Sequence, residues 1–113
     1  MSGSGGTAAR VDAATIGVYA RKLYQEVGRQ QRYPASAARL GMKGTARIRL
    51  RIRRDGSVVG TPQLVGSSGH EVLDAEALRM VEAAMPFAPL PEGFHLPSAL
   101  FLIPVDFSLR NPG

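Results

Sequence analysis

The sequence predicts an α+β domain in which a three-stranded antiparallel-type sheet, in the order 2-1-3, carries two helices on one face. Residues 45–53 alternate strictly between apolar and polar side chains, which is typical of a strand with one buried face. Apolar residues recur at helical spacing in residues 12–27 and again in residues 71–85. Prolines interrupt the two remaining strand segments, and this indicates that those strands lie at the edges of the sheet.

The first element is a helix over residues 12–27. Its apolar residues follow the helical repeat, and they are Ile16, Tyr19, Ala20, Leu23 and Val27. Asp12 fits an N-cap and Gly28 a C-terminal stop. Pro34 biases Tyr33 towards an extended backbone. Residues 35–44 are then expected to form a short turn or loop.

The central strand follows at residues 45–53. Its apolar positions are Ala46, Ile48, Leu50 and Ile52, and its polar positions are Thr45, Arg47, Arg49, Arg51 and Arg53. Asp55-Gly56 is a favoured dipeptide for a tight hairpin turn. The returning strand therefore begins near Val58 and passes through Pro62 and Leu64.

A second helix and a last strand complete the predicted domain. Ser67-Ser68-Gly69-His70 interrupts the second strand, and a helix follows over residues 71–85. The apolar positions of this helix are Leu73, Ala77, Met80, Val81 and Ala84. Pro86 ends the helix, because proline lacks the backbone donor that a further turn needs. The last strand runs from about residue 99 to residue 109, with Ile103, Val105, Phe107 and Leu109 on one face.

The prolines determine the predicted strand order. Pro62 lies in the second strand and Pro104 in the third, whereas the first strand has none. Since proline cannot donate to a ladder, the first strand is central. The hairpin makes strands one and two antiparallel, and a right-handed crossover returns strand three to the far side of strand one. Both helices then cover the face that bears Leu50, and the arginines face water.

Length and composition indicate one domain with a modest core. Residues 1–10 are expected to be a flexible linker or an expression remnant, residues 11–110 the folded domain, and residues 111–113 a tail. No apolar run approaches the roughly 20 residues that a membrane helix needs. The sequence contains no cysteine, which excludes a disulfide framework and a cysteine-based metal site.

The charge is unevenly distributed along the chain. Residues 1–54 carry 12 basic and two acidic residues, whereas residues 55–113 carry two basic and seven acidic ones. The arginine stripe from Arg47 to Arg53 suggests either an anionic partner or a solvated face. Sheets that bind nucleic acid often interleave aromatic residues for base stacking. No aromatic residue occurs between Pro34 and Met85, so a nucleic-acid partner is not expected and a basic nucleic-acid-binding module is the weaker alternative.

The sequence gives little support for catalysis or for a cofactor. His70 lies near Ser67, Ser68 and Asp74, but proximity in sequence does not make a catalytic triad. His95 lies in a proline-rich loop without a carboxylate at ligand spacing. We therefore predict no catalytic residue, no metal and no cofactor.

Five short segments, in a fixed order, resemble the TonB C-terminal domain family. The segments are Tyr33-Pro34 through Gly44, Asp55-Gly56-Ser57-Val58, Ser67 through Leu78, Pro86-Phe87-Ala88-Pro89 and Ile103-Pro104-Val105-Asp106-Phe107-Ser108-Leu109. The resemblance covers about residues 12–109, and the ordered set at these spacings is distinctive. The leading helix with Tyr19 and the Tyr33-Pro34 pair fit this family better than the similar TolA C-terminal domain.

This resemblance implies a non-enzymatic periplasmic domain of an inner-membrane-anchored protein, whose anchor lies outside the present sequence. With ExbB and ExbD, such a protein couples the proton-motive force to outer-membrane receptors for siderophores, haem or vitamin B12. The domain grips a receptor segment, the TonB box, which adds as a strand beside the last strand. The implied contact residues are Gln30, Arg32, Tyr33, Leu102, Ile103, Pro104, Val105, Asp106 and Phe107.

Two features depart from the best-known member of the family. They are Pro104 in the docking strand and one extra residue near Pro62.

Other associations are open to such a domain. A TolA-like periplasmic domain of an envelope-integrity system remains the alternative of the same class. A small core and an open sheet edge also favour strand exchange, so a homodimer is a second expected association. In the docking strand we expect Leu102, Pro104 and Asp106 to direct their backbone groups outwards.

Overall fold

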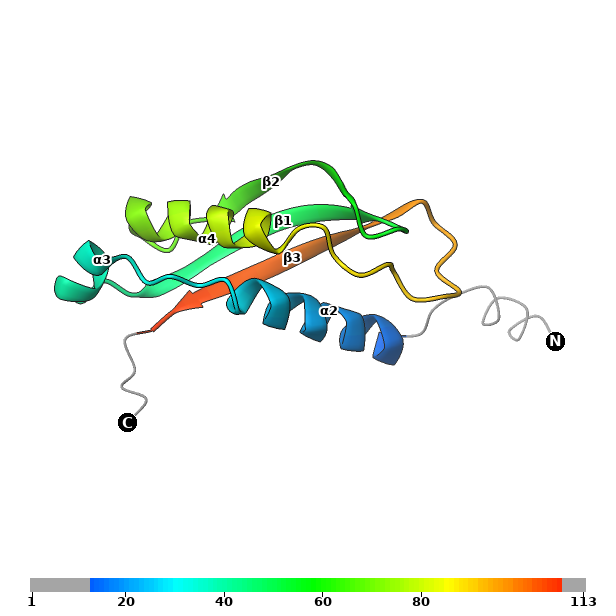
Figure 1. Cartoon of the computed structure of the whole chain (residues 1–113), viewed down its shortest axis with the longest axis horizontal. Coiled ribbons are helices and arrows are strands. Elements are labelled where there is room, and N and C mark those ends of the chain that lie inside the picture. Colours follow the sequence, from blue (N-terminus) through cyan, green and yellow to red (C-terminus); the bar gives the residue numbers. More distant parts are fainter. Residues whose placement is uncertain (1–12, 109–113) are drawn as a thin grey trace.

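The predicted sheet and the two helices are present in the structure, a computed structural model that describes residues 13–108. In chain order the elements are α2 (Ala13–Gly28), α3 (Ala35–Arg39), β1 (Gly44–Arg53), β2 (Val58–Gly66), α4 (Glu71–Ala84) and β3 (Ser98–Phe107). The strand order is β2-β1-β3, and both pairs are antiparallel. In Figure 1 the long helices α2 and α4 lie on the same side of an elongated sheet. The fold class and the strand order predicted from the sequence are therefore confirmed, while the expected N-cap Asp12 and the strand residue Leu109 lie outside the described residues.

The core forms where the helices meet the apolar face of the sheet. Every second residue of β1 is buried from Ala46 to Ile52, and every second residue of β3 from Phe101 to Phe107. The helices contribute Tyr19, Leu23 and Val27 from α2, and Leu73, Ala77, Met80 and Val81 from α4. The arginines of β1 are exposed on the opposite face. The alternation in the sequence thus identifies the buried face correctly.

One sequence prediction is wrong in part. Residues 35–44 were expected to lack regular structure, but α3 occupies Ala35–Arg39. Pro34 precedes the helix in an extended conformation, with φ −61° and ψ 133°, and three of the five residues of α3 are alanine, the strongest helix former. Ala37 is fully buried, so packing onto the core supports a helix too short to persist alone.

The tight turn after β1 is packed against the chain that follows α4. Gly56 has φ +95°, and an added Cβ atom there would lie 2.0 Å from the carbonyl oxygen of Phe87. The backbone N–H of Phe87 donates to the carbonyl of Gly56 at 3.0 Å. Only glycine allows this close approach, which ties the hairpin to the segment between α4 and β3.

The two edges of the sheet differ in regularity. β1 pairs with β3 without a register shift over the ten residues of each strand. β2 instead shifts register at two places, and three residues, 60–62, stand opposite the single residue Leu50. Such bulges twist an edge strand and interrupt its row of donors and acceptors. The extra length near Pro62 noted in the sequence therefore lies in an irregular part of β2, and β3 is the regular edge.

A candidate strand-docking edge

The outer side of β3 is defined by two hydrogen bonds from the α2 region. The Tyr24 hydroxyl donates to the carbonyl oxygen of Leu102 at 3.2 Å, and the Gln31 side-chain amide donates to that of Asp106 at 3.0 Å. These two carbonyls therefore point away from β1. Since backbone groups alternate along a strand, Pro104 faces outwards as well. This geometry agrees with the orientation expected for the three residues.

The remaining candidate residues of β3 face the interior. Ile103, Val105 and Phe107 are buried side chains of the core, and by the same alternation their backbone groups face β1. Arg47 lies opposite Pro104 in the β1–β3 pairing. An outward Pro104 leaves this pairing intact, because proline lacks only the N–H that would otherwise point to solvent. An incoming strand would meet the backbone of Leu102, Pro104 and Asp106. The side chains of the other three residues instead hold β3 against the core.

The segment that carries Gln30 and Arg32 is held by an ion pair on α4. Glu76 accepts a hydrogen bond from the backbone N–H of Arg32 at 2.7 Å and pairs with the Arg79 guanidinium at 2.8 Å. Arg79 in turn donates to the carbonyl oxygen of Gln30 at 2.5 Å. Glu76 is buried, at 8% exposure. One charged pair therefore fixes two backbone groups of the segment that follows α2.

Tyr33 lies at the end of β3 rather than along its outer edge. Its ring meets that of Phe107 edge to face, with a centroid distance of 5.8 Å and an angle of 85°. Its hydroxyl donates to the carbonyl oxygen of Met42. Tyr33 thus connects the segment before α3 to the C-terminal end of β3. Tyr33 therefore contacts β3 through the buried ring of Phe107 and not through the outer backbone groups of the strand.

The hydrogen bonds at Glu76 outweigh the effect of its burial on its pKa. Burial alone would raise the pKa of this carboxyl. The bond from Arg79, followed by that from the Arg32 backbone, lowers it below its ordinary value. A depressed pKa in the folded state means that ionised Glu76 stabilises the fold above the pKa of the unfolded chain. That contribution is lost as the pH falls through the folded-state pKa.

Replacing Glu76 by glutamine should lower the free energy of unfolding at pH 7 by about 1–2 kcal/mol, because the charged acceptor of three hydrogen bonds is lost. The deficit should narrow as the pH falls well below about 4.5, where Glu76 of the unmodified protein also becomes protonated. Urea denaturation at a series of pH values measures both effects. Glu82→Gln, an exposed change on the same helix, is the control. If the difference in free energy of unfolding between the variant and the unmodified protein stayed constant down to the lowest pH, Glu76 would not act through its charge.

A groove lies between α2 and the outer part of β3. Its volume is about 230 Å³, and its lining includes Tyr24, Val27, Gln31, Met80 and Pro104. In Figure 1, α2 runs alongside β3. The floor is apolar because Val27 and Met80 are core residues. The rim carries the two side chains that bond to the β3 carbonyls.

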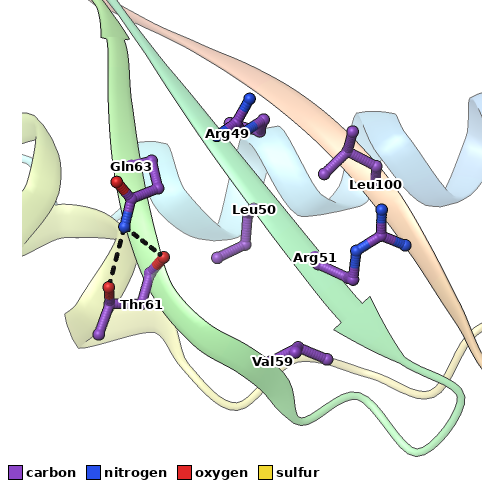
Figure 2. Close-up of a pocket in the computed structure, with 7 residues that line it drawn as sticks. All are labelled: Arg49, Leu50, Arg51, Val59, Thr61, Gln63 and Leu100. Atoms are coloured by element: carbon purple, nitrogen blue, oxygen red, sulfur yellow. Dashed lines mark hydrogen bonds between the residues drawn. The ribbon is translucent and has the colours of Figure 1, made fainter.

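The uncovered face of the sheet forms a second, basic hollow (Figure 2). Arg49 and Arg51 line it together with Val59, Gln63 and Leu100, and its volume is about 310 Å³. It lies where β2 bulges opposite Leu50. Within residues 13–108 the arginines of β1 form no ion pair, and Arg51 donates to the Ser98 hydroxyl at 3.0 Å. These cations are therefore available to solvent or to an anionic partner.

The residues around His70 begin helix α4 and do not form a triad. The hydroxyls of Ser67 and Ser68 both donate to the Asp74 carboxylate, at 2.5 and 2.7 Å. Burial would raise the pKa of Asp74, but these bonds and that of the Ser68 backbone lower it. Among residues 13–108 no serine hydroxyl bonds to the His70 ring. The cluster thus ties the turn that precedes α4 to Asp74 in the first turn of the helix.

The described part of the chain, residues 13–108, contains no group of three histidine, cysteine, aspartate or glutamate side chains placed to hold a metal ion. None of the helices between residues 13 and 108 has the length and hydropathy needed to cross a bilayer.

Sequence reasoning missed four residues that shape the edge, namely Tyr24, Gln31, Glu76 and Arg79. A signal for the first two was present, because Ala20, Tyr24, Val27 and Gln31 recur at helical spacing on one face. The Glu76–Arg79 pair also has helical spacing. That pair resembles an ordinary surface ion pair, since only the fold brings the backbone of residues 30–32 onto it.

Comparison with known proteins gives consistent results. Residues 29–109 match the family described as Gram-negative bacterial TonB protein C-terminal. The chain is 32% identical over 96 residues to Protein TonB of Pasteurella multocida (strain Pm70), and the match covers 85% of this chain. It covers 36% of that relative, so the chain spans about a third of the length of the curated protein it matches.

Solved structures show the same architecture. An NMR structure of the Helicobacter pylori TonB C-terminal domain superposes with a TM-score of 0.67 at 27% identity, covering 82% of this chain and 96% of that one. The structure of the HasB C-terminal domain superposes with a TM-score of 0.52 at 31% identity, covering 84% of this chain and 72% of that one.

Proposed function

This chain belongs to the TonB protein C-terminal family, and from this premise we propose that it grips outer-membrane receptors by adding a receptor strand, the TonB box, to the edge of β3. The family is one of non-catalytic, energy-transducing interaction domains, and we infer that this domain acts without catalysis. The gripped segment transmits mechanical work to the receptor, which takes up a siderophore, haem or vitamin B12.

The regular edge of β3 is the observation that carries this proposal. Strand addition requires a regular row of backbone groups along one edge of the sheet. β3 keeps one register with β1 along its whole length, so its outer groups lie in a straight row. β2 is bulged at two places and contains the buried Pro62. β3 is therefore the edge that suits an incoming strand.

The candidate contact residues divide into three roles. Leu102, Pro104 and Asp106 present backbone groups to the receptor strand, while Ile103, Val105 and Phe107 fix the strand to the core. Gln30 and Arg32 lie on the segment that Glu76 and Arg79 hold, next to the groove. Tyr33 joins that segment to the end of β3 through Phe107.

We further propose that the protein is anchored in the inner membrane, that this domain lies in the periplasm, and that the protein associates with ExbB and ExbD. A homodimer formed through the sheet edge is a competing association of the same surface.

Titration with a synthetic TonB-box peptide, followed by amide hydrogen exchange, tests the docking mode. In the free domain the amides of Ile103, Val105 and Phe107 should be protected, and those of Leu102 and Asp106 should exchange quickly, because they face outwards. The peptide should slow the exchange at Leu102 and Asp106 and leave the β2 amides unchanged. Protection of Leu102 and Asp106 before any peptide is added would contradict the proposal, as would slowing confined to β2.

A further inference from the structure

The outer row of β3 is already occupied at the positions that strand addition would use. The carbonyls of Leu102 and Asp106 accept hydrogen bonds from Tyr24 and Gln31. Between them stands Pro104, which has no N–H to donate. Three successive outward positions therefore each lack either a free acceptor or a donor.

The two edges of the sheet are thus protected in different ways. On β2 the protection is built into the backbone, as register shifts that no side-chain movement removes. On β3 the backbone stays regular, and two side chains from the α2 region cover it. Protection by side chains is reversible, because rotation about side-chain bonds uncovers the carbonyls without unfolding the strand.

The covering bonds are also weak enough to exchange. Tyr24 is 37% exposed, and both bonds lie at the surface. Each such bond competes with water and contributes little net free energy. Beneath them, the groove of about 230 Å³ leaves space next to the strand. An incoming segment would break the two side-chain hydrogen bonds. Its own backbone donors would replace them, and its side chains would add apolar contacts in the groove.

We propose that Tyr24 and Gln31 guard the docking edge: they cap the outward carbonyls of β3 in the free domain, and a receptor strand binds by displacing both. This inference rests on the proposed function. The edge becomes selective, because a strand that forms only two hydrogen bonds in place of the two that it breaks gains no binding free energy. The guard also protects the edge against pairing with a second copy of the chain.

The double variant Tyr24→Phe, Gln31→Met tests the guard, because it removes both donors and keeps the size of each side chain. Gln25→Met makes the same chemical change at an exposed position of α2 and serves as the matched control. Circular dichroism establishes that each variant is folded. Calorimetry with a synthetic TonB-box peptide then measures affinity, and sedimentation over a range of protein concentrations measures self-association.

The guard predicts that the double variant binds the peptide about two- to tenfold more tightly than the unmodified protein, which corresponds to two weak bonds that no longer compete. Its self-association should also be stronger, and the control should match the unmodified protein in both measurements. Unchanged or weaker peptide binding by the double variant would overturn the guard and would assign the two side chains to holding the peptide. If no protein bound the peptide, the proposed function would fail. The guard would then be judged by self-association alone, and an unchanged association constant would overturn it.

Discussion

Replacing Leu50 by alanine is expected to lower the free energy of unfolding by about 2–5 kcal/mol, a large part of the stability of a small domain. Leu50 lies in the central strand, is 1% exposed, and faces the helices with its neighbours Ile48 and Ile52. Truncation would leave a cavity between the sheet and the helices, where rigid strands limit relaxation. For a domain of this size a loss of 1 kcal/mol lowers the melting temperature by roughly 4–8 °C.

Arg51→Ala is the matched control, since it truncates the next residue of the same strand. Arg51 is exposed on the open face, and within residues 13–108 its guanidinium donates only to the Ser98 hydroxyl. Surface substitutions of this kind usually change stability by about 0.5 kcal/mol or less. Thermal and urea denaturation of both variants give the comparison. Equal destabilisation at residues 50 and 51 would contradict the assignment of the two faces of the sheet.

Local patterns were sufficient to predict the architecture. The alternation through Leu50 identified the buried face, because a strand has a side-chain period of two and only one face is covered. Pro62 and Pro104 predicted the strand order, because proline removes a ladder donor and is tolerated at an edge. Each rule uses only residues within one strand segment, so both can be applied to the sequence without knowledge of the fold.

The details of the docking edge depend on contacts between distant residues. Tyr24 and Leu102 are 78 residues apart in sequence, and Gln31 and Asp106 are 75 apart. No local pattern specifies that a helix-face tyrosine will reach a particular carbonyl. The same is true of Glu76, whose acceptor role requires the Arg32 backbone to arrive from 44 residues away. The sequence therefore predicts where a strand would dock, and the fold determines what covers that place.

Leu102→Pro is expected to weaken binding of a TonB-box peptide by about 10- to 100-fold while the domain stays folded. The Leu102 carbonyl bonds to Tyr24, so the N–H of this residue also points away from β1. Proline would remove that donor, and a receptor carbonyl left without a partner costs about 1–3 kcal/mol. Together with Pro104, the change would leave two neighbouring outward positions without a donor. The β1–β3 ladder would keep its bonds, as it does at Pro104.

Leu102→Ala separates the backbone effect from the side-chain effect. This variant removes the same half-exposed side chain but keeps the N–H, so it should bind within a few-fold of the unmodified domain. The two variants should unfold at similar denaturant concentrations, and calorimetry with one peptide should separate them in affinity. If proline and alanine weakened binding equally, the peptide would contact the Leu102 side chain rather than the strand backbone. If neither weakened it, the receptor segment would not add to β3, and the basic hollow of Arg49 and Arg51 on the open face would be the next surface to test by substitution.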